Sequence, residues 1–433
     1  MARTIEGGFI IRGLVAALNA DGPKSAATQD VVEYRGSRNK SYRRFLDNAT
    51  TDAHKGTMNS RFAACLCLLI LLVWGRYSRA EELVTLRSKD VELVWAPAGG
   101  ALVRFQLRDD ETNPLNWEAA PDLVRRQEAV PVLRGHFLCL DRWGAPSAAE
   151  QAHGMPFHGE APQVAWKVEK SPSSSTGTIS AEMSCVLPIA GMRVARRIVL
   201  DEAASVALVT ERVTNTNKLG RLYNIVQHPS IAPPFLNDET LVDTNAQQGF
   251  VQDEPVPASR SSAGRWPKLK IDGGDVDLRR FRSEQTDASQ HDVSSFVFAH
   301  PEAFGWVAAT SPRHKLLLGY VWKTVDYPWL NIWRYRLGGK LAARGLEFGT
   351  TGYHQPFPIL VRQGPILDRP TYEHLDADEA VSKSYLCFLA RVPADFEGVG
   401  DLRFEGGAIR LREHRKVNPR IIQLHTRLSL TPP

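Results

Sequence analysis

The chain has 433 residues, a formal net charge of +5 and a sequence pI near 8.9. Its charged residues are interspersed, and no basic stripe carries interleaved aromatic side chains, which argues against a nucleic-acid partner. A 43% hydrophobic content is ample for a large buried core and excludes a largely disordered chain.

The segment at residues 58–80 has the pattern of a secretory signal peptide. Arg61 supplies a basic start, Ala63–Trp74 is an unbroken apolar run, and Ser78-Arg79-Ala80 forms a small-x-small cleavage site. A membrane span needs about 20 apolar residues, so an uncleaved N-terminal membrane anchor is the alternative. We therefore predict a periplasmic or secreted protein that meets the membrane only through that alternative.

Residues 1–57 are polar and show no sustained periodicity. We expect them to be disordered or, because a signal peptide should start a chain, to precede a true translation start at Met58. The mature chain would begin at Glu81 and keep Cys139, Cys185 and Cys387. Such an odd, sparse set predicts no disulfide framework, and few cysteines suit a bacterial periplasm.

Short strand patterns dominate residues 81–412. They are rich in Val, Ile, Leu, Thr and aromatic residues, and Gly, Pro, Asp, Asn and Ser separate them. Only Pro121–Glu128 and Asp376–Lys383 favour short helices. The expected strands are Leu83–Leu86, Val91–Trp95, Ala101–Leu107, Val164–Val168, Thr178–Leu187, Arg193–Leu200, Ala207–Thr214, Leu222–His228, Ser295–His300, Gly305–Ala309, Lys315–Lys323, Trp329–Tyr335 and Ser384–Arg391.

This pattern predicts an all-β fold, a large β-sandwich that occupies residues 81–412 as one domain. No interior segment looks like a domain linker. The polar stretches Lys170–Gly177, Gln252–Gly264 and Ile271–Gln290 are expected to be loops. Residues 413–433 are rich in Arg and Lys and are expected to form a basic C-terminal tail.

Three segments each place one titratable group among apolar, Gly or Pro residues, at or beyond an expected strand. These groups are His158, His228 and Glu347. Two imidazoles and a carboxylate can do paired acid and base work near neutral pH, and burial of a carboxylate favours a base of raised pKa. The structural alternatives are a loop histidine, an ordinary strand-end histidine and a glutamate paired with Arg344.

Other chemistries find less support in the sequence. His153 and His158 lie five positions apart and match no zinc pattern, no Gly-x-Ser-x-Gly segment is present, and no glycine-rich phosphate loop occurs. We therefore predict neither a metal nor a cofactor. Sugar rings pack their C–H faces on aromatic planes, and core packing is the alternative for the candidate aromatic residues Trp143, Trp322, Trp329 and Trp333.

Taken in order, His158-Gly159, the segment from Asn224 to His228, and Gly345-Leu346-Glu347 resemble the galactose mutarotase-like superfamily, which contains the aldose 1-epimerases. The resemblance covers roughly Leu83–Arg412. It implies a β-supersandwich and an isomerase that interconverts the anomers of a small carbohydrate without a cofactor.

The resemblance also implies roles for individual residues. Glu347 would be the base on the anomeric hydroxyl, His228 the acid on the ring oxygen, and His158 a ligand of a hydroxyl group. Arg134 or Arg142 would stand in for the arginine that binds substrate in the family. Trp322 and Trp329 complete the predicted substrate-binding residues.

The sequence departs from the family pattern at two positions. Glu160 replaces the second glycine of a His-Gly-Gly segment, and Pro229 follows the second histidine. These departures indicate a divergent member and leave the sugar open. They also leave two alternatives, a non-catalytic carbohydrate-binding sandwich and a lyase or hydrolase of the same fold. In a hydrolase, Glu160 and Glu347 would form the carboxylate pair.

Overall fold

A computed structural model describes residues 82–120, 131–286, 289–299 and 304–430. The chain divides into two compact units, Met1–Arg79 and Ala80–Pro433, and the described residues all belong to the second. The predicted signal peptide, the extension before it and the expected helix at Pro121–Glu128 lie outside the described residues. None of the helices in the described ranges is long and apolar enough to cross a membrane.

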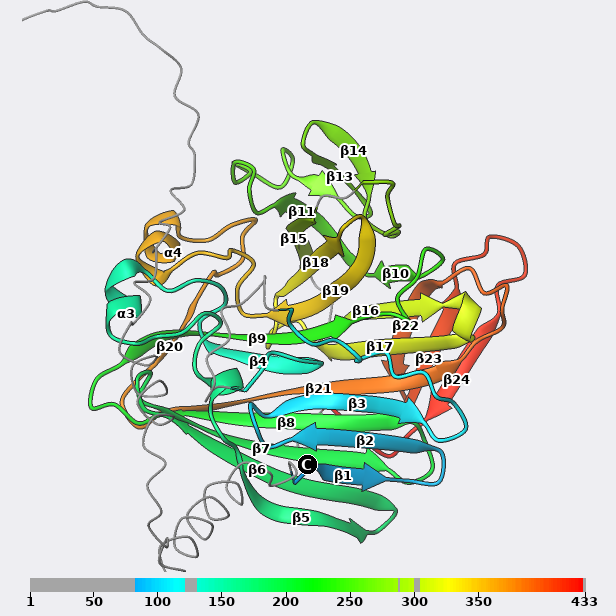
Figure 1. The fold of residues 1–433 in the computed structure, drawn as a ribbon, viewed down its shortest axis with the longest axis horizontal. Coiled ribbons are helices and arrows are strands. Elements are labelled where there is room, and N and C mark those ends of the chain that lie inside the picture. The colour runs from blue at the N-terminus through cyan, green and yellow to red at the C-terminus, as the bar shows by residue number, and fades with distance from the viewer. Residues whose placement is uncertain (1–81, 121–130, 287–288, 300–303, 431–433) are drawn as a thin grey trace, which may run out of the picture. The chain divides into compact units, whose positions relative to one another are not determined.

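Two large antiparallel sheets form the sandwich among these residues (Figure 1). The first sheet runs in the order β1 (Val84–Arg87), β2 (Val91–Ala96), β3 (Ala101–Leu107), β4 (His136–Asp141), β9 (Arg221–Ile231), β19 (Lys340–Gly349), β18 (Trp329–Leu337), β15 (Gln290–Phe298), β11 (Ala246–Val251), β12 (Gly264–Arg265), β13 (Lys268–Ile271) and β14 (Gly274–Asp277), with β20 (Glu373–Leu375) also paired to β9. The second sheet runs in the order β10 (Leu241–Thr244), β16 (Phe304–Ser311), β17 (Leu316–Lys323), β21 (Ala380–Arg391), β8 (Val206–Asn215), β7 (Met192–Asp201), β6 (Thr178–Leu187) and β5 (Lys167–Ser175). The predicted all-β sandwich is confirmed.

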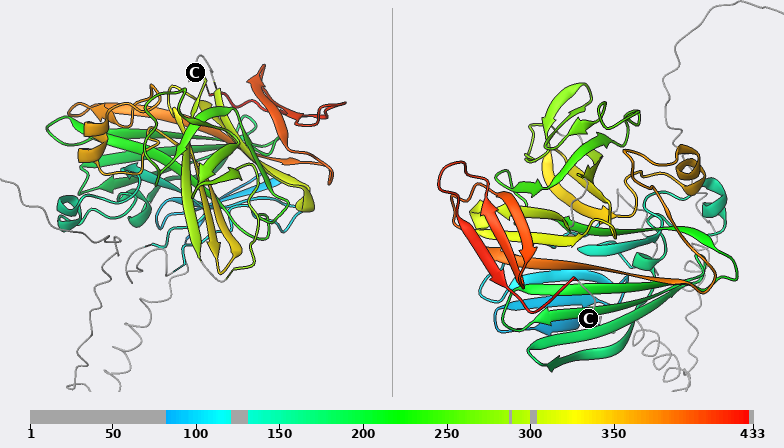
Figure 2. Two further views of the ribbon diagram at one scale, coloured as in Figure 1. Left: turned by 90° about the horizontal axis from the view of Figure 1, so that it is seen from above. Right: turned by 180° about the vertical axis from the view of Figure 1, so that it is seen from behind.

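A third, smaller sheet of β22 (Val399–Glu405), β23 (Ala408–Glu413) and β24 (Ile421–His425) closes the chain (Figure 2). Its apolar face packs on β21, where Ile409 and Leu411 join Phe388 in a buried cluster. Leu428 and Leu430, beyond β24, are buried in the same cluster. The segment expected to be a basic tail therefore contains a paired strand and part of a core.

Helices are few and short in the described ranges, namely α3 (Ala148–Ala152), α4 (Phe357–Gln363) and the 3-10 turns Ala161–Gln163 and Pro312–His314. The expected helix at Asp376–Lys383 is wrong, because β21 already begins at Ala380 and pairs there with Thr214 of β8. The expected loop Lys170–Gly177 is also largely wrong. Strand β5 continues to Ser175, and only Thr176 and Gly177, both at positive φ, form the turn.

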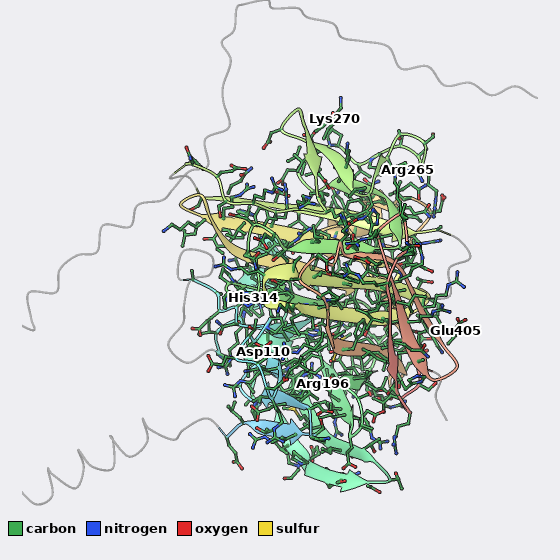
Figure 3. The ribbon with its side chains drawn as sticks, turned by 90° about the vertical axis from the view of Figure 1, so that its right-hand side faces the viewer. Asp110, Arg196, Arg265, Lys270, His314 and Glu405 are labelled. Atoms are coloured by element: carbon green, nitrogen blue, oxygen red, sulfur yellow. The ribbon has the colours of Figure 1, made fainter. Side chains whose placement is uncertain are left out.

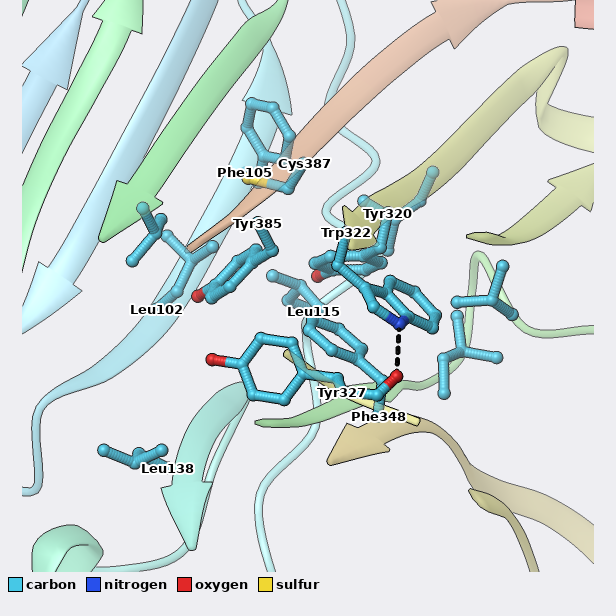
Figure 4. Packing of buried hydrophobic residues seen from close by; sticks show 14 of the residues in the cluster. Leu102, Phe105, Leu115, Leu138, Tyr320, Trp322, Tyr327, Phe348, Tyr385 and Cys387 are labelled. Carbon is cyan, nitrogen blue, oxygen red and sulfur yellow. Dashed lines mark hydrogen bonds between the residues drawn. The ribbon is translucent and has the colours of Figure 1, made fainter. Parts of the chain in front are cut away.

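The main core lies between the two large sheets. Figure 4 shows Leu138 and Phe348 of the first sheet in a cluster with Tyr320, Trp322 and Tyr385 of the second. Successive residues of a strand face opposite sides of a sheet. The neighbours of these core residues, Phe137 and Glu347 among them, therefore face away from the main core, where a separate aromatic cluster lies.

A buried polar network also joins the two sheets. Arg196 of β7, which Figure 3 labels, pairs with Glu211 of β8, and both side chains are 1% exposed. Gln227 of β9 donates to Glu211 Oε2 at 2.6 Å, and Arg196 donates to the carbonyl of Gly100. Charged groups this deep need full pairing. Here Glu211 has a hydrogen-bonded partner on β9 of the first sheet, and Arg196 has one in the turn between β2 and β3.

Candidate active site

Two neighbouring strands of the first sheet carry the central pair of side chains. His228 lies on β9 and Glu347 on β19, and the two strands pair through Phe348 and Gln227. Since Gln227 and Phe348 face the core, His228 and Glu347 both face the other side. The sequence alternation thus explains why residues separated by more than a hundred positions meet on one surface.

The two groups are in direct contact. His228 Nε2 lies 3.2 Å from Glu347 Oε1, and both side chains are almost fully buried. The other ring nitrogen of His228, Nδ1, lies 3.1 Å from Ser230 Oγ. The imidazole is therefore fixed at both nitrogens, with Nε2 directed at the carboxyl group.

Burial controls the protonation of this pair. Burial raises the pKa of Glu347 well above its ordinary value, and the hydrogen bond from Trp143 Nε1 to Oε2, 2.7 Å long, partly opposes that rise. Burial lowers the pKa of His228 to about 3. Burial therefore favours the neutral form of both groups, so a proton shared by the pair favours the carboxyl group.

His158 reaches the same surface from a loop. It has a positive φ of 65°, a strained conformation for a residue other than glycine. Gly159 follows at φ 77°, and a Cβ there would lie 2.0 Å from the carbonyl oxygen of Leu140, so only glycine allows this approach to β4. The backbone N–H of Gly144 donates to His158 Nδ1 at 3.1 Å.

That last contact determines the tautomer of His158. A nitrogen that accepts a hydrogen bond from a backbone N–H carries no proton, so the neutral ring has its proton on Nε2. Burial, together with the nearby His228 and His354, lowers the pKa of His158 well below its ordinary value. His158 is thus a neutral hydrogen-bond donor beside the central pair.

A cavity of about 220 Å³ opens at these three residues. Sequence reasoning missed most of its lining. Gln252, Asp253, His291 and His354 add polar groups, and the apolar and aromatic lining consists of Trp117, Ala119, Leu133, Phe137, Trp143, Phe157, Val293 and Trp333. The cavity combines a few polar groups with aromatic walls, which is the usual composition of a small-molecule site.

His354 was present in the sequence pattern but was not singled out. It follows β19 a few residues after Glu347, and its ring lies 4.5 Å from the Trp143 ring and 5.7 Å from that of His158, centre to centre. Burial lowers its pKa to about 4. His354 lies between Gly352 and Pro356 just beyond a strand, and a titratable group among Gly, Pro or apolar residues at or beyond a strand was the signal that marked His158 and His228.

Four predicted substrate-binding residues lie elsewhere. Arg142 is buried in ion pairs with Asp141 and Glu150. The backbone of Arg134 forms an isolated β-bridge with that of Glu118, and Arg134 is not among the residues that line the cavity. Trp322 stacks on Phe348 in the main core, and Trp329 is fully buried and donates to the carbonyl of Pro370, so neither offers a face to the cavity. Of the four candidate tryptophans, Trp143 and Trp333 line the cavity.

The carboxylate pair considered for a hydrolase does not form. Glu160 is buried and accepts hydrogen bonds from the backbone N–H groups of Ile189 and Ala190, which fixes a loop rather than facing the cavity. Within the described ranges, no group of three or more His, Cys, Asp or Glu side chains is arranged to hold a metal ion.

Comparison with known proteins identifies the fold. Neither a protein-family model nor a curated protein matches the sequence. Among solved structures, a proposed aldose 1-epimerase from Klebsiella pneumoniae superposes with a TM-score of 0.55 at 15% identity, over 72% of this chain and 80% of that one. A proposed aldose 1-epimerase from Escherichia coli K12 and a galactose mutarotase-like protein from Clostridium acetobutylicum each give a TM-score of 0.49 at 13% identity over 72% of this chain, and over 100% and 96% of their own lengths. The first of these establishes a galactose mutarotase-like β-sandwich with a strongly diverged sequence.

Proposed function

We propose, from the mutarotase-like fold and its acid–base pair, that this protein is an aldose 1-epimerase-like isomerase that interconverts the anomers of a small carbohydrate. The observation that carries the proposal is the 3.2 Å contact between Glu347 and His228 at the base of an aromatic cavity. The proposal includes export through the signal pattern at residues 58–80. N-terminal sequencing of the processed chain tests this part, with Glu81 as the expected first residue.

The chemistry requires an acid and a base side by side. Opening a cyclic hemiacetal removes a proton from O1 and delivers one to O5, and rotation about C1–C2 before closure gives the other anomer. Because O1 and O5 are both bonded to C1, the groups that serve them must be neighbours. Glu347 and His228 meet this requirement, and Glu347 acts as the base on O1 while His228 acts as the acid on O5.

One proton in the pair is enough for a full cycle. In the resting protein it favours Glu347, and its transfer to His228 Nε2 across their contact produces a carboxylate and an imidazolium. The carboxylate then takes the O1 proton as the imidazolium protonates O5. Ring closure reverses both transfers, so the pair ends as it began.

The remaining lining suits a sugar. His158 offers a neutral Nε2–H to a hydroxyl group or to the ring oxygen, beside the acid. The apolar C–H face of a pyranose packs against Trp117 and Trp333, whose rings lie 5.5 Å apart at 82°. These two residues replace Trp322 and Trp329 as the proposed aromatic contacts.

The test is anomer interconversion by the purified protein, followed by polarimetry or NMR exchange with freshly dissolved α-aldoses. We expect acceleration that Glu347→Gln and His228→Asn each reduce by at least about a hundredfold, as removal of an acid or a base does. The matched controls are Glu405→Gln and His425→Asn, exposed residues of the C-terminal sheet, which should keep the full rate.

No acceleration with any aldose by the folded protein would refute the epimerase. Saturable sugar binding that survives in Glu347→Gln would then indicate the non-catalytic carbohydrate-binding sandwich instead.

A further inference from the structure

A four-residue segment at the end of β4, Asp141–Gly144, contacts Glu347, His158 and His354 of the cavity. The indole N–H of Trp143 donates to Glu347 Oε2, and the backbone N–H of Gly144 donates to His158 Nδ1. Gly144 also leaves space for His354, because a Cβ at this position would lie 2.6 Å from that ring. One short segment therefore holds the base, the auxiliary histidine and a further imidazole of the cavity.

Buried charges anchor this segment from the other side. The guanidinium of Arg142 is 3% exposed and binds Glu150 through two hydrogen bonds of 2.7 and 2.8 Å. Arg142 also donates to Asp141, and Asp141 accepts a further hydrogen bond from the guanidinium of Arg221. Bidentate, buried arginine–carboxylate pairs have well-defined geometry. They hold the two residues that directly precede Trp143, and so restrict the direction of the Trp143 side chain.

We propose that Trp143 is a positioning residue that holds the Glu347 carboxylate toward His228 and favours its ionised form, and that Arg142 supports it by fixing the Asp141–Gly144 segment. This inference rests on the proposed function for its catalytic meaning, since it concerns the base of that reaction. Its physical content, the coupling of the Trp143 indole to Glu347, belongs to the resting protein.

The direction of the Trp143–Glu347 hydrogen bond determines its effect on the carboxyl group. An N–H donor stabilises a carboxylate more than a neutral carboxyl group, whereas burial does the opposite. Trp143 is the donor that opposes the desolvation of Glu347. Loss of this donor would shift the shared proton further toward Glu347, away from His228. The carboxylate–imidazolium form that reacts would then be rarer at every pH at which the pair holds one proton, and the pair would lose that proton only at higher pH.

The variant Trp143→Phe removes the N–H and keeps an aromatic ring. Its matched control is Trp329→Phe, because Trp329 is fully buried, lies outside the cavity and donates to a backbone carbonyl at the same 2.7 Å. The first measurement is the pH titration of the Glu347 carboxyl carbon by NMR, assigned by its loss in Glu347→Gln. The second is the pH profile of anomer interconversion.

We expect Trp143→Phe to raise the titration midpoint of Glu347, to lower the rate on the plateau of the pH profile, and to move the alkaline limb, where the pair loses its proton, to higher pH. Trp329→Phe should leave all three unchanged. Loss of a hydrogen bond to a charged group corresponds to a rate at neutral pH about 10- to 100-fold lower. A titration midpoint unchanged in folded Trp143→Phe, or moved equally in Trp329→Phe, would overturn the proposal.

A further readout needs no substitution at Trp143. In the wild-type protein, the indole N–H resonance of Trp143 should shift with pH at the midpoint of Glu347, and it should lose this shift in Glu347→Gln. An indole resonance insensitive to Glu347 would refute the coupling even if Trp143→Phe failed to fold. Absence of epimerase activity in the wild type would refute only the proposed function, because both titrations are measured without substrate.

Discussion

The absence of a side chain at Gly345 makes room for the Glu347 carboxyl group. Both residues lie on the same face of β19, two positions apart. A Cβ at Gly345 would lie 2.6 Å from Glu347 Oε1 and 3.0 Å from the Cβ of Trp333. The carboxyl oxygen that contacts His228 therefore occupies space that any other residue would fill.

We expect Gly345→Ala to displace Glu347 from His228 and to reduce anomer interconversion by about a hundredfold, the usual effect of a misplacement near 1 Å. The midpoint temperature of thermal unfolding should change little, whereas the rate of anomer interconversion should fall strongly. The control is Gly274→Ala on β14, where a Cβ would meet nothing closer than 3.7 Å. A full rate in Gly345→Ala would contradict the crowding argument.

The central residues could be found from the sequence, but their partners could not. His158, His228 and Glu347 each stand as a single titratable group among apolar, Gly or Pro residues, which is a local signal. The role of Trp143 depends on a residue about 200 positions away, and local sequence does not contain such a contact. The prediction that Arg142 binds substrate does not agree with its position, for the same reason. Arg142 pairs with Glu150, eight residues along the chain, and the local sequence does not indicate that contact.

At the scale of elements, the alternation of apolar and polar residues identified most strands but located their ends poorly. The expected strand Leu222–His228 falls within β9, and Lys315–Lys323 begins one residue before β17 and ends with it. Buried apolar residues mark the pattern in both. By contrast, β5 is exposed along nearly all its length and rich in serine, so backbone pairing to β6 holds it without an apolar signal. Strand β24 was missed similarly, because only its pairing and the leucines that follow it reveal a folded segment.

The anchoring of the C-terminal segment gives a second prediction. Asp201 of β7 accepts hydrogen bonds from Thr426 Oγ1 and the backbone N–H of Arg427, at 2.7 and 2.9 Å, and Leu428 is buried directly after them. We expect Leu428→Ala to lower the free energy of unfolding in urea by about 2–5 kcal/mol, as truncation of a buried leucine does.

The exposed Ile421 of β24 provides the control for this measurement. Its side chain is 49% exposed, so Ile421→Ala should cost well under half as much. Equal, small effects of the two substitutions would mean that the segment after residue 412 behaves as a solvated tail, as first expected from its basic composition.

At the scale of the whole molecule, the buried Arg196–Glu211 pair of the second sheet carries a third prediction, because its hydrogen bonds to Gln227 and to the Gly100 carbonyl link it to the first sheet. Glu211→Gln would leave the guanidinium of Arg196 buried without its counter-charge, at a cost of about 3–5 kcal/mol in the free energy of unfolding. The double variant Arg196→Leu with Glu211→Leu should recover much of that loss, because it removes both buried charges.

An exposed ion pair provides the control that separates the effect of burial on stability from the effect of losing any ion pair. Lys170 and Glu182 on β5 and β6 form an ion pair at 3.0 Å with a lysine side chain that is 70% exposed. Glu182→Gln should change stability by about 1 kcal/mol or less. If Glu211→Gln cost no more than Glu182→Gln, the network would not be what joins the sheets.

The burial of three cysteines in the sandwich determines when their thiol groups can react. Cys139, Cys185 and Cys387 are free and buried. Burial raises the pKa of Cys185 and of Cys387 to about 12, and it raises the pKa of Cys139 well above its ordinary value. Thiolates, the reactive form, are therefore scarce while the chain is folded. These sulfurs become accessible to alkylating reagents only when the sheets separate. The rate at which an alkylating reagent modifies these cysteines therefore reports how often the two sheets separate, in reducing and oxidising surroundings alike.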